Sequence, residues 1–174
     1  MPFKTYEMAN YEIPYFGALN LQQLEAYATE TIEFKNRSVT IDMNLLNGNS
    51  VSEAEMKVIK GFLENLESYT NQIGTILPTD YSARGATYDY MEEFLRELDD
   101  EDLLSALHGT DEELSTEERM FQKFYIKRIS FYPEKEDELL AVIDYAISGN
   151  VTEDVLVVML NKQMKLKGIV IERG

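Results

Sequence analysis

The apolar residues of this 174-residue chain change their spacing twice, and that order limits the folds open to it. Over 38–45 apolar and polar side chains alternate, which is typical of a strand with one buried face. Over about 53–76 the apolar residues recur at helical spacing. From about 125 to 171 the chain returns to short apolar runs. Strands followed by helices and then strands predict the α+β class rather than alternating α/β units.

We therefore expect an antiparallel sheet of about five to seven strands, packed against a long central helix and two or three shorter helices. The expected strands lie at 16–21, 27–34, 38–45, 125–132, 139–147, 155–160 and 166–171. The expected helices lie at 53–76, 87–98, near 103–107 and after Ser115.

Several residues predict where these elements begin and end. Ser52 with a Glu three residues later, and Ser115 with a Glu at the same spacing, are capping-box signatures. Pro78 should close the long helix, and Gly109 should stop the short one. Residues 36–37 lie between two strand-like runs, where a tight hairpin would turn.

The length suits a single α+β domain over 1–174, with an irregular, aromatic-rich N-terminal arm at 1–15. The chain has no cysteine, which excludes disulfides, thiolate nucleophiles and Cys-based zinc sites. No apolar run approaches the roughly 18 residues of a membrane span, and residues 1–16 contain no apolar core of a secretory signal. We expect a soluble cytoplasmic protein.

Charge is concentrated in one block at 89–118. The block holds thirteen acidic residues against the single base Arg96, a net charge of −12 out of −16 for the whole chain. Such a surface repels nucleic acid and anionic membranes and attracts cationic proteins. The densest basic cluster, Lys123 with Lys127 and Arg128, is too small for a nucleic-acid footprint.

The acidic block supplies the candidate binding residues. They are Glu97, Asp99, Asp100, Glu101, Asp102, Asp111, Glu112 and Glu113. A solvated helix face is the alternative interpretation, because acids at the start of a helix are favourable in themselves. Four adjacent acids do not match the spacing of a calcium loop, so no metal is predicted.

No catalytic signature stands out in the sequence. His108 is the only histidine, and a general-base histidine needs an orienting partner. There is no nucleophile elbow and no phosphate-binding glycine loop, so neither a catalytic residue nor a cofactor is predicted. Asp42, Asp144 and Glu172 lie on expected strands and could converge, which keeps an enzyme of unknown class as an alternative.

Five segments resemble a bacterial family known only as a domain of unknown function, number two thousand and four. The segments are VTIDMNL at 39–45, FLENL at 62–66, FYP at 131–133, VIDYAI at 142–147 and TEDVLVV at 152–158. The resemblance spans about 16–172 and rests on strand and turn patterns. It implies an α+β domain without an assigned activity.

The chain departs from that family in three places. SGN at 148–150 holds an extra residue, Arg173 stands where a Ser is expected, and FLRE at 94–97 replaces a Phe-His pair. The last departure weakens any role for a histidine on that helix. Small acidic bacterial families of this kind include immunity proteins of polymorphic toxins, which is a fold-level analogy.

The leading hypothesis is a non-catalytic protein-binding module whose acidic surface meets a cationic partner, in its most specific form an immunity protein that binds a toxin nuclease. Complementary charge would speed this association. The alternatives are an enzyme using the strand carboxylates and a structural domain that self-associates, for which a homodimer is expected.

Overall fold

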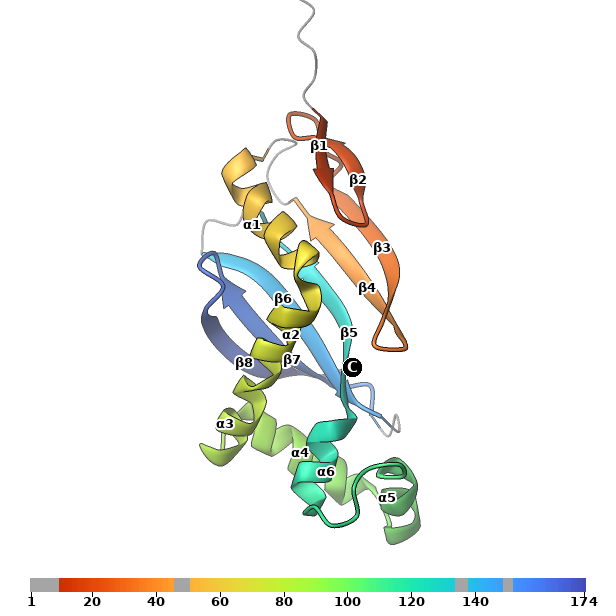
Figure 1. The fold of residues 1–174 in the computed structure, drawn as a ribbon. Coiled ribbons are helices and arrows are strands. Elements are labelled where there is room, and N and C mark those ends of the chain that lie inside the picture. The colour runs from red at the N-terminus through yellow and green to blue at the C-terminus, as the bar shows by residue number, and fades with distance from the viewer. Residues whose placement is uncertain (1–9, 46–50, 134–137, 149–151) are drawn as a thin grey trace, which may run out of the picture.

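The computed structural model describes residues 10–45, 51–133, 138–148 and 152–174. It confirms the α+β class: a six-stranded sheet, a two-stranded sheet and a set of helices between the strands. Helices α1 (Glu53–Glu64) and α2 (Leu66–Gly74) cross one face of the large sheet, while α3 to α6, within 76–123, gather at one end of it (Figure 1). The two-stranded sheet lies at the other end (Figure 1).

The large sheet contains the six long strands that the sequence predicts. In spatial order they are β3 (Tyr27–Phe34), β4 (Arg37–Asn44), β5 (Phe124–Phe131), β6 (Leu139–Ile147), β7 (Val155–Asn161) and β8 (Leu166–Glu172). Four of the five neighbouring pairs are antiparallel, and β4 pairs with β5 in parallel. The predicted antiparallel sheet is thus confirmed except at this one parallel pair.

The parallel pair exists because the helices return the chain to the end of the sheet from which β4 started. A parallel pair cannot be joined by a tight turn and needs a crossover, and residues 45–123 supply it. Ile41 lies opposite Ile129, and Met43 lies opposite Phe131. All four side chains are buried beneath the helices, so the seam between the two halves of the sheet is apolar on this face.

The β3–β4 hairpin turns at Lys35 and Asn36, one residue earlier than predicted. Both residues have positive φ, 50° and 60°. A two-residue turn with both residues in this region matches the twist of the flanking strands, and Asn tolerates it well. The turn pairs Phe34 with Arg37, which places two cationic side chains at the tip of the hairpin.

The predicted long helix is not continuous. The structure has α1 (Glu53–Glu64), α2 (Leu66–Gly74) and α3 (Ile76–Ser82), with breaks at Asn65 and Thr75. The Asn65 amide donates to the carbonyl of Gly61 at 2.9 Å, and such local bonds compete with the helical ladder. The prediction that Pro78 ends the long helix is wrong. Pro78 lies in the first turn of α3, where the backbone N–H groups have no partner within the helix, so a proline is tolerated.

The other helices follow the predicted signals closely. They are α4 (Ala86–Glu97), α5 (Asp100–Ala106) and α6 (Thr116–Lys123). Reciprocal capping boxes form at Ser52 and Ser115, as predicted. The backbone at Gly109 has a φ of 81°, which suits a glycine just beyond a helix end.

The N-terminal arm is corrected in part. Residues 10–13, expected to be irregular, form β1 (Asn10–Ile13), which pairs with β2 (Gly17–Asn20). Ile13 is 2% exposed and belongs to the same hydrophobic core as the large sheet. Burial of that side chain gives the segment its fixed place. The rest of the expected arm, 1–9, lies outside the described residues.

Aromatic rings join α1 and α2 to the sheet. Phe62 stacks on Tyr69 with ring centroids 5.3 Å apart, and it meets Phe131 edge-on at 5.4 Å. Phe62 and Phe131 are both almost fully buried. Burying a phenylalanine of this kind stabilises the fold by about 1.5–3 kcal/mol.

Two sets of side-chain hydrogen bonds hold α4 in place. Gly85 has no side chain to cap the first turn, and the Asp80 carboxylate accepts from the Thr87 N–H instead, at 2.7 Å. At the other end of the chain, Arg173 donates two hydrogen bonds to Glu93 and one to Asp154. The residue that departs from the family pattern thus ties α4 to the end of the sheet.

Two glycine substitutions should move stability in opposite directions. Gly61 lies inside α1 with open space where a Cβ would stand, so Gly61→Ala should stabilise the protein by about 0.5–1 kcal/mol. At Gly85 a Cβ would collide with the Asp80 carboxylate. Gly85→Ala should therefore displace that cap and cost about 1 kcal/mol or more. Urea unfolding of both variants measures the difference, and equal effects would contradict the described approach of Asp80 to Gly85.

Candidate functional site

The eight predicted acidic residues all lie exposed at the helical end of the molecule. They fall on the end of α4, on α5 and in the loop before α6, which we call the acidic lobe (97–113). The lobe lies at the end of the molecule opposite the two-stranded sheet (Figure 1). Among the described residues, no ion pair involves any of the eight acids, so no described cationic side chain neutralises their charge.

Two of these acids have a structural role as well. The Asp99 carboxylate accepts from the Asp102 N–H at 2.8 Å and caps α5. The Asp111 carboxylate accepts from the Glu113 N–H at 3.0 Å in the following turn. Asp99 therefore fits the alternative interpretation of the block, in which the acids stabilise the start of a helix.

Helix α5 contributes little to the core. None of its residues is buried, and Leu104 is 69% exposed between the acidic side chains. Leu107, at the end of the helix, is 2% exposed and anchors the lobe to the core, with Leu103 partly buried beside it. The lobe therefore presents carboxylates around one exposed leucine.

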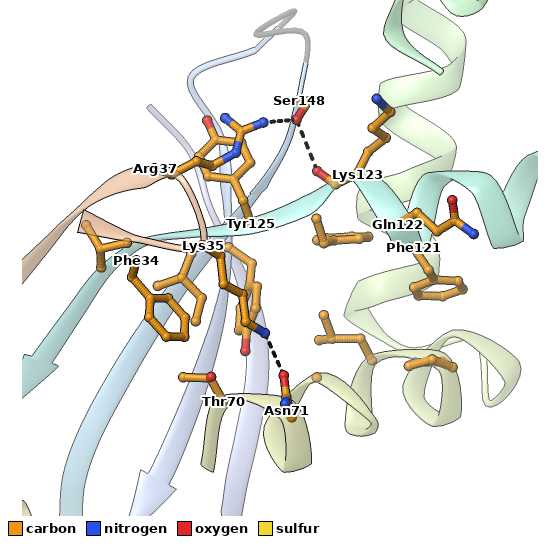
Figure 2. Close-up of a pocket in the computed structure, with 17 residues that line it drawn as sticks. Phe34, Lys35, Arg37, Thr70, Asn71, Phe121, Gln122, Lys123, Tyr125 and Ser148 are labelled. Carbon is orange, nitrogen blue, oxygen red and sulfur yellow. Dashed lines mark hydrogen bonds between the residues drawn. The ribbon is translucent and has the colours of Figure 1, made fainter. Parts of the chain in front are cut away.

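A pocket of about 500 Å³ lies between the tip of the β3–β4 hairpin, α2, the junction of α6 with β5, and the end of β6. Figure 2 shows Phe34 and Lys35 reaching from the hairpin towards Asn71 of α2, whereas Arg37 points to the other side of β5, towards Ser148. The volume falls within the range of small-molecule sites.

Three cationic side chains line this pocket, and each is held by a neutral acceptor. Lys35 donates to the amide oxygen of Asn71, Arg37 to the hydroxyl of Ser148, and Lys123 to the carbonyl of His108. No ion pair of the described part of the chain includes any of the three. A strongly acidic protein thus keeps three uncompensated positive charges at one hollow.

The walls of the pocket are largely aromatic. Phe121 and Phe124 lie nearly parallel, with centroids 5.9 Å apart, and Phe124 meets Tyr145 edge-on at 6.5 Å. The guanidinium carbon of Arg37 lies 4.0 Å from the centroid of the Tyr125 ring. Cations stacked on rings in this way are held in place without losing their charge.

Tyr145 also lines the pocket and carries an unusual polar atom. Its hydroxyl is buried and has no hydrogen-bond partner among the described residues. Burial raises the pKa of the Tyr145 hydroxyl far above its ordinary value, so the group stays protonated. A buried hydroxyl without a partner costs about 1–3 kcal/mol.

The strand carboxylates Asp42, Asp144 and Glu172 share the sheet face away from the helices. The register places Asp42 opposite Ser130, and Asp144 opposite Arg128. Asp42 is 2% exposed and is held by the Tyr27 hydroxyl at 2.7 Å and by Arg128 at 3.3 Å. These three acids do not line the pocket of Figure 2.

Electrostatics couple these groups across β4, β5, β6 and β8. Burial raises the pKa of the Asp144 carboxyl above its ordinary value of 3.8, while the Arg128 guanidinium opposes that rise and Glu172 adds to it. Burial and the neighbouring carboxylates likewise raise the pKa of the Tyr132 hydroxyl. Alternate strands lie roughly 10 Å apart, so Asp42 and Asp144 flank Arg128 rather than meet each other.

His108 follows the short helix α5 and is exposed. Its backbone carbonyl accepts from Lys123, and the structure gives its imidazole no partner in the described ranges. Within those ranges, no three His, Asp or Glu residues lie close enough together to hold a metal ion. In the same part of the chain, no helix is both long and apolar enough to cross a membrane.

Comparisons of the chain with protein families, with curated proteins and with solved structures found no match in any of the three. The resemblance to the family of unknown function therefore stays a prediction.

Sequence reasoning did not predict the pocket. Its lining comes from the hairpin, α2, α6, β5 and β6, which are far apart in the sequence. The sequence places Lys123 in a small basic cluster and Arg37 in a turn. Basic and aromatic residues lie close together at 34–37 and at 121–125, which is a usable signal, but nothing in the sequence joins these two segments.

Replacement of Asp144 should make stability less dependent on pH. Since the folded pKa of Asp144 is raised, the folded state disfavours its charged form, and stability falls as the pH rises through that pKa. Asp144→Asn should therefore be more stable than the wild type at pH 7. The gain should shrink as the pH falls and vanish well below 3.8, where the acid is protonated in both states. Urea unfolding across this range tests the sign, and a loss of stability at pH 7 would contradict it.

The two buried tyrosine hydroxyls should respond differently to removal. Tyr145→Phe deletes an oxygen without a partner and should raise stability by about 1 kcal/mol. Tyr90→Phe is the matched control, because the Tyr90 hydroxyl donates to the carbonyl of Asp154 at 3.2 Å. It should lower stability by about 1 kcal/mol. Thermal unfolding compares them, and equal losses would show that Tyr145 has a partner in solution.

Proposed function

We propose that the protein is a non-catalytic protein-binding module that binds a cationic partner through the acidic lobe. The observation that carries this proposal is the eight exposed acids of the lobe, none of which is ion-paired within the described residues. Uncompensated charge on a projecting element attracts an oppositely charged surface over several ångströms. It contributes more to the rate and specificity of binding than to affinity.

The lobe also offers an apolar contact at its centre. Leu104 is 69% exposed on α5, with Asp100, Glu101 and Asp102 in the first turn of the same helix. An interface of this composition has an apolar centre and a charged rim. The partner that fits it has a small apolar depression surrounded by Lys and Arg.

A toxin nuclease is the most specific partner within this proposal, because a nucleic-acid-binding surface is basic by necessity. The chain would then act as an immunity protein that covers that surface. We place this activity in the cytoplasm, in keeping with a chain that has no cysteine. We include in this proposal that the chain is a member of the bacterial family of unknown function that it resembles.

Neutralising α5 should weaken binding to a cationic partner. We compare the triple variant Asp100→Asn, Glu101→Gln, Asp102→Asn with wild type, using poly-L-lysine as the charge-only probe and a basic nuclease domain as the protein probe. The variant should bind at least about tenfold more weakly. Binding by the wild type should fall steeply between about 50 and 500 mM salt, because salt screens exposed charges.

A matched control carries the same change of charge at the opposite end of the molecule. Glu12→Gln, Glu25→Gln, Glu30→Gln removes three exposed acids from β1, from the turn before β3 and from β3. If both triple variants weaken binding equally, only net charge matters and the lobe is not the binding surface.

Light scattering of the free protein tests the alternative of a homodimer. If a dimer forms, the sheet is the next surface to test.

A further inference from the structure

The pocket beside the β3–β4 hairpin differs in charge from the rest of the protein. The chain carries a net charge of −16, yet the ionisable side chains that line this hollow are Lys35, Arg37, Lys123 and two tyrosines, with no carboxylate among them. A hollow of one charge sign concentrates the field and attracts ions of the opposite sign. The positive charge of the side chains that line this pocket therefore favours an anionic ligand.

Lys35 is the cation in position to accept that anion, because it reaches across the hollow to Asn71, while Arg37 and Lys123 point to the other side of β5 (Figure 2). Each of the three cations is held by a neutral oxygen, from Asn71, Ser148 or the backbone of His108. Neutral acceptors fix the direction of a side chain and leave its charge uncompensated. A carboxylate or phosphate could replace or share these neutral contacts and gain a charge-assisted bond.

The remainder of the pocket favours a flat apolar body. Phe121 and Phe124 present nearly parallel rings, and Tyr145 stands edge-on to Phe124. Rings prefer offset-stacked or edge-to-face neighbours, so these walls suit a planar aromatic group. The buried Tyr145 hydroxyl, which lacks a partner among the described residues, is a further donor beside this space.

We propose that this pocket binds a small aromatic molecule that carries one anionic group, with the ring packed against the aromatic walls and the anion at Lys35. The site is separate from the acidic lobe and does not depend on the lobe's function. The volume of about 500 Å³ holds a bicyclic aromatic acid.

The test titrates the full chain with three probes of one ring system, followed by calorimetry. 1-Naphthoate and 1-naphthyl phosphate differ in the source of the anion, and 1-naphthalenemethanol lacks the charge. We expect one molecule of an anionic probe per chain, with a Kd below about 1 mM. The alcohol should bind at least about tenfold more weakly, since it cannot form the charge-assisted bond.

Charge-removing variants locate the site. Lys35→Gln should weaken binding of the anionic probe at least about tenfold, because Lys35 is the cation that faces the hollow. Arg84→Gln is the control, because it removes one positive charge from a side chain that does not line the pocket. It should bind as the wild type does. Circular dichroism confirms that each variant is folded.

Three results would overturn the proposal. They are a Kd above about 1 mM for both anionic probes, an alcohol that binds as tightly as the anions, or equal losses in Lys35→Gln and Arg84→Gln. None of these results bears on the acidic lobe. Failure of the lobe variants would likewise leave the pocket proposal standing.

Discussion

The parallel pairing of β4 with β5 is the constraint on which the rest of the structure depends. It joins an N-terminal hairpin to a C-terminal group of four antiparallel strands, and it needs a long crossover because parallel strands start at the same end. All six helices of the described residues lie in that crossover. The seam is apolar towards the helices, through Ile41 and Ile129. On the opposite face, the buried Asp42 carboxylate bonds to residues of both neighbouring strands.

The same crossover sets the acidic lobe beside the cationic pocket. The chain leaves the lobe, forms α6 and enters β5, and the residues at that junction line the pocket. Lys123 lies at the boundary: it lines the pocket and donates to the carbonyl of His108 at the end of the lobe. Charges of opposite sign are thus kept in adjacent regions without neutralising each other, since the partners of the pocket cations are neutral groups.

Local patterns predicted local structure well. The alternation at 38–45 and the apolar run at 155–160 became strands within one residue of their predicted ends, and both capping boxes formed as predicted. The errors arose where distant residues decide. The helix over 53–76 broke at Asn65 and Thr75, although apolar spacing continued through both. The N-terminal segment became a strand because Ile13 is buried in a core built by residues far along the chain.

The sequence by itself determined the α+β class, the order of the elements and the concentration of acid at 89–118, because periodicity, caps and charge depend on residues close together in the chain. It also identified Asp42, Asp144 and Glu172 as strand carboxylates, but not that Arg128 would lie between the first two. Only the tertiary structure decided the parallel seam and the pocket of Lys35, Arg37 and Tyr145. Those features arise from contacts between segments separated by dozens of residues, whose pairing is set by packing of the whole core and not by any local pattern.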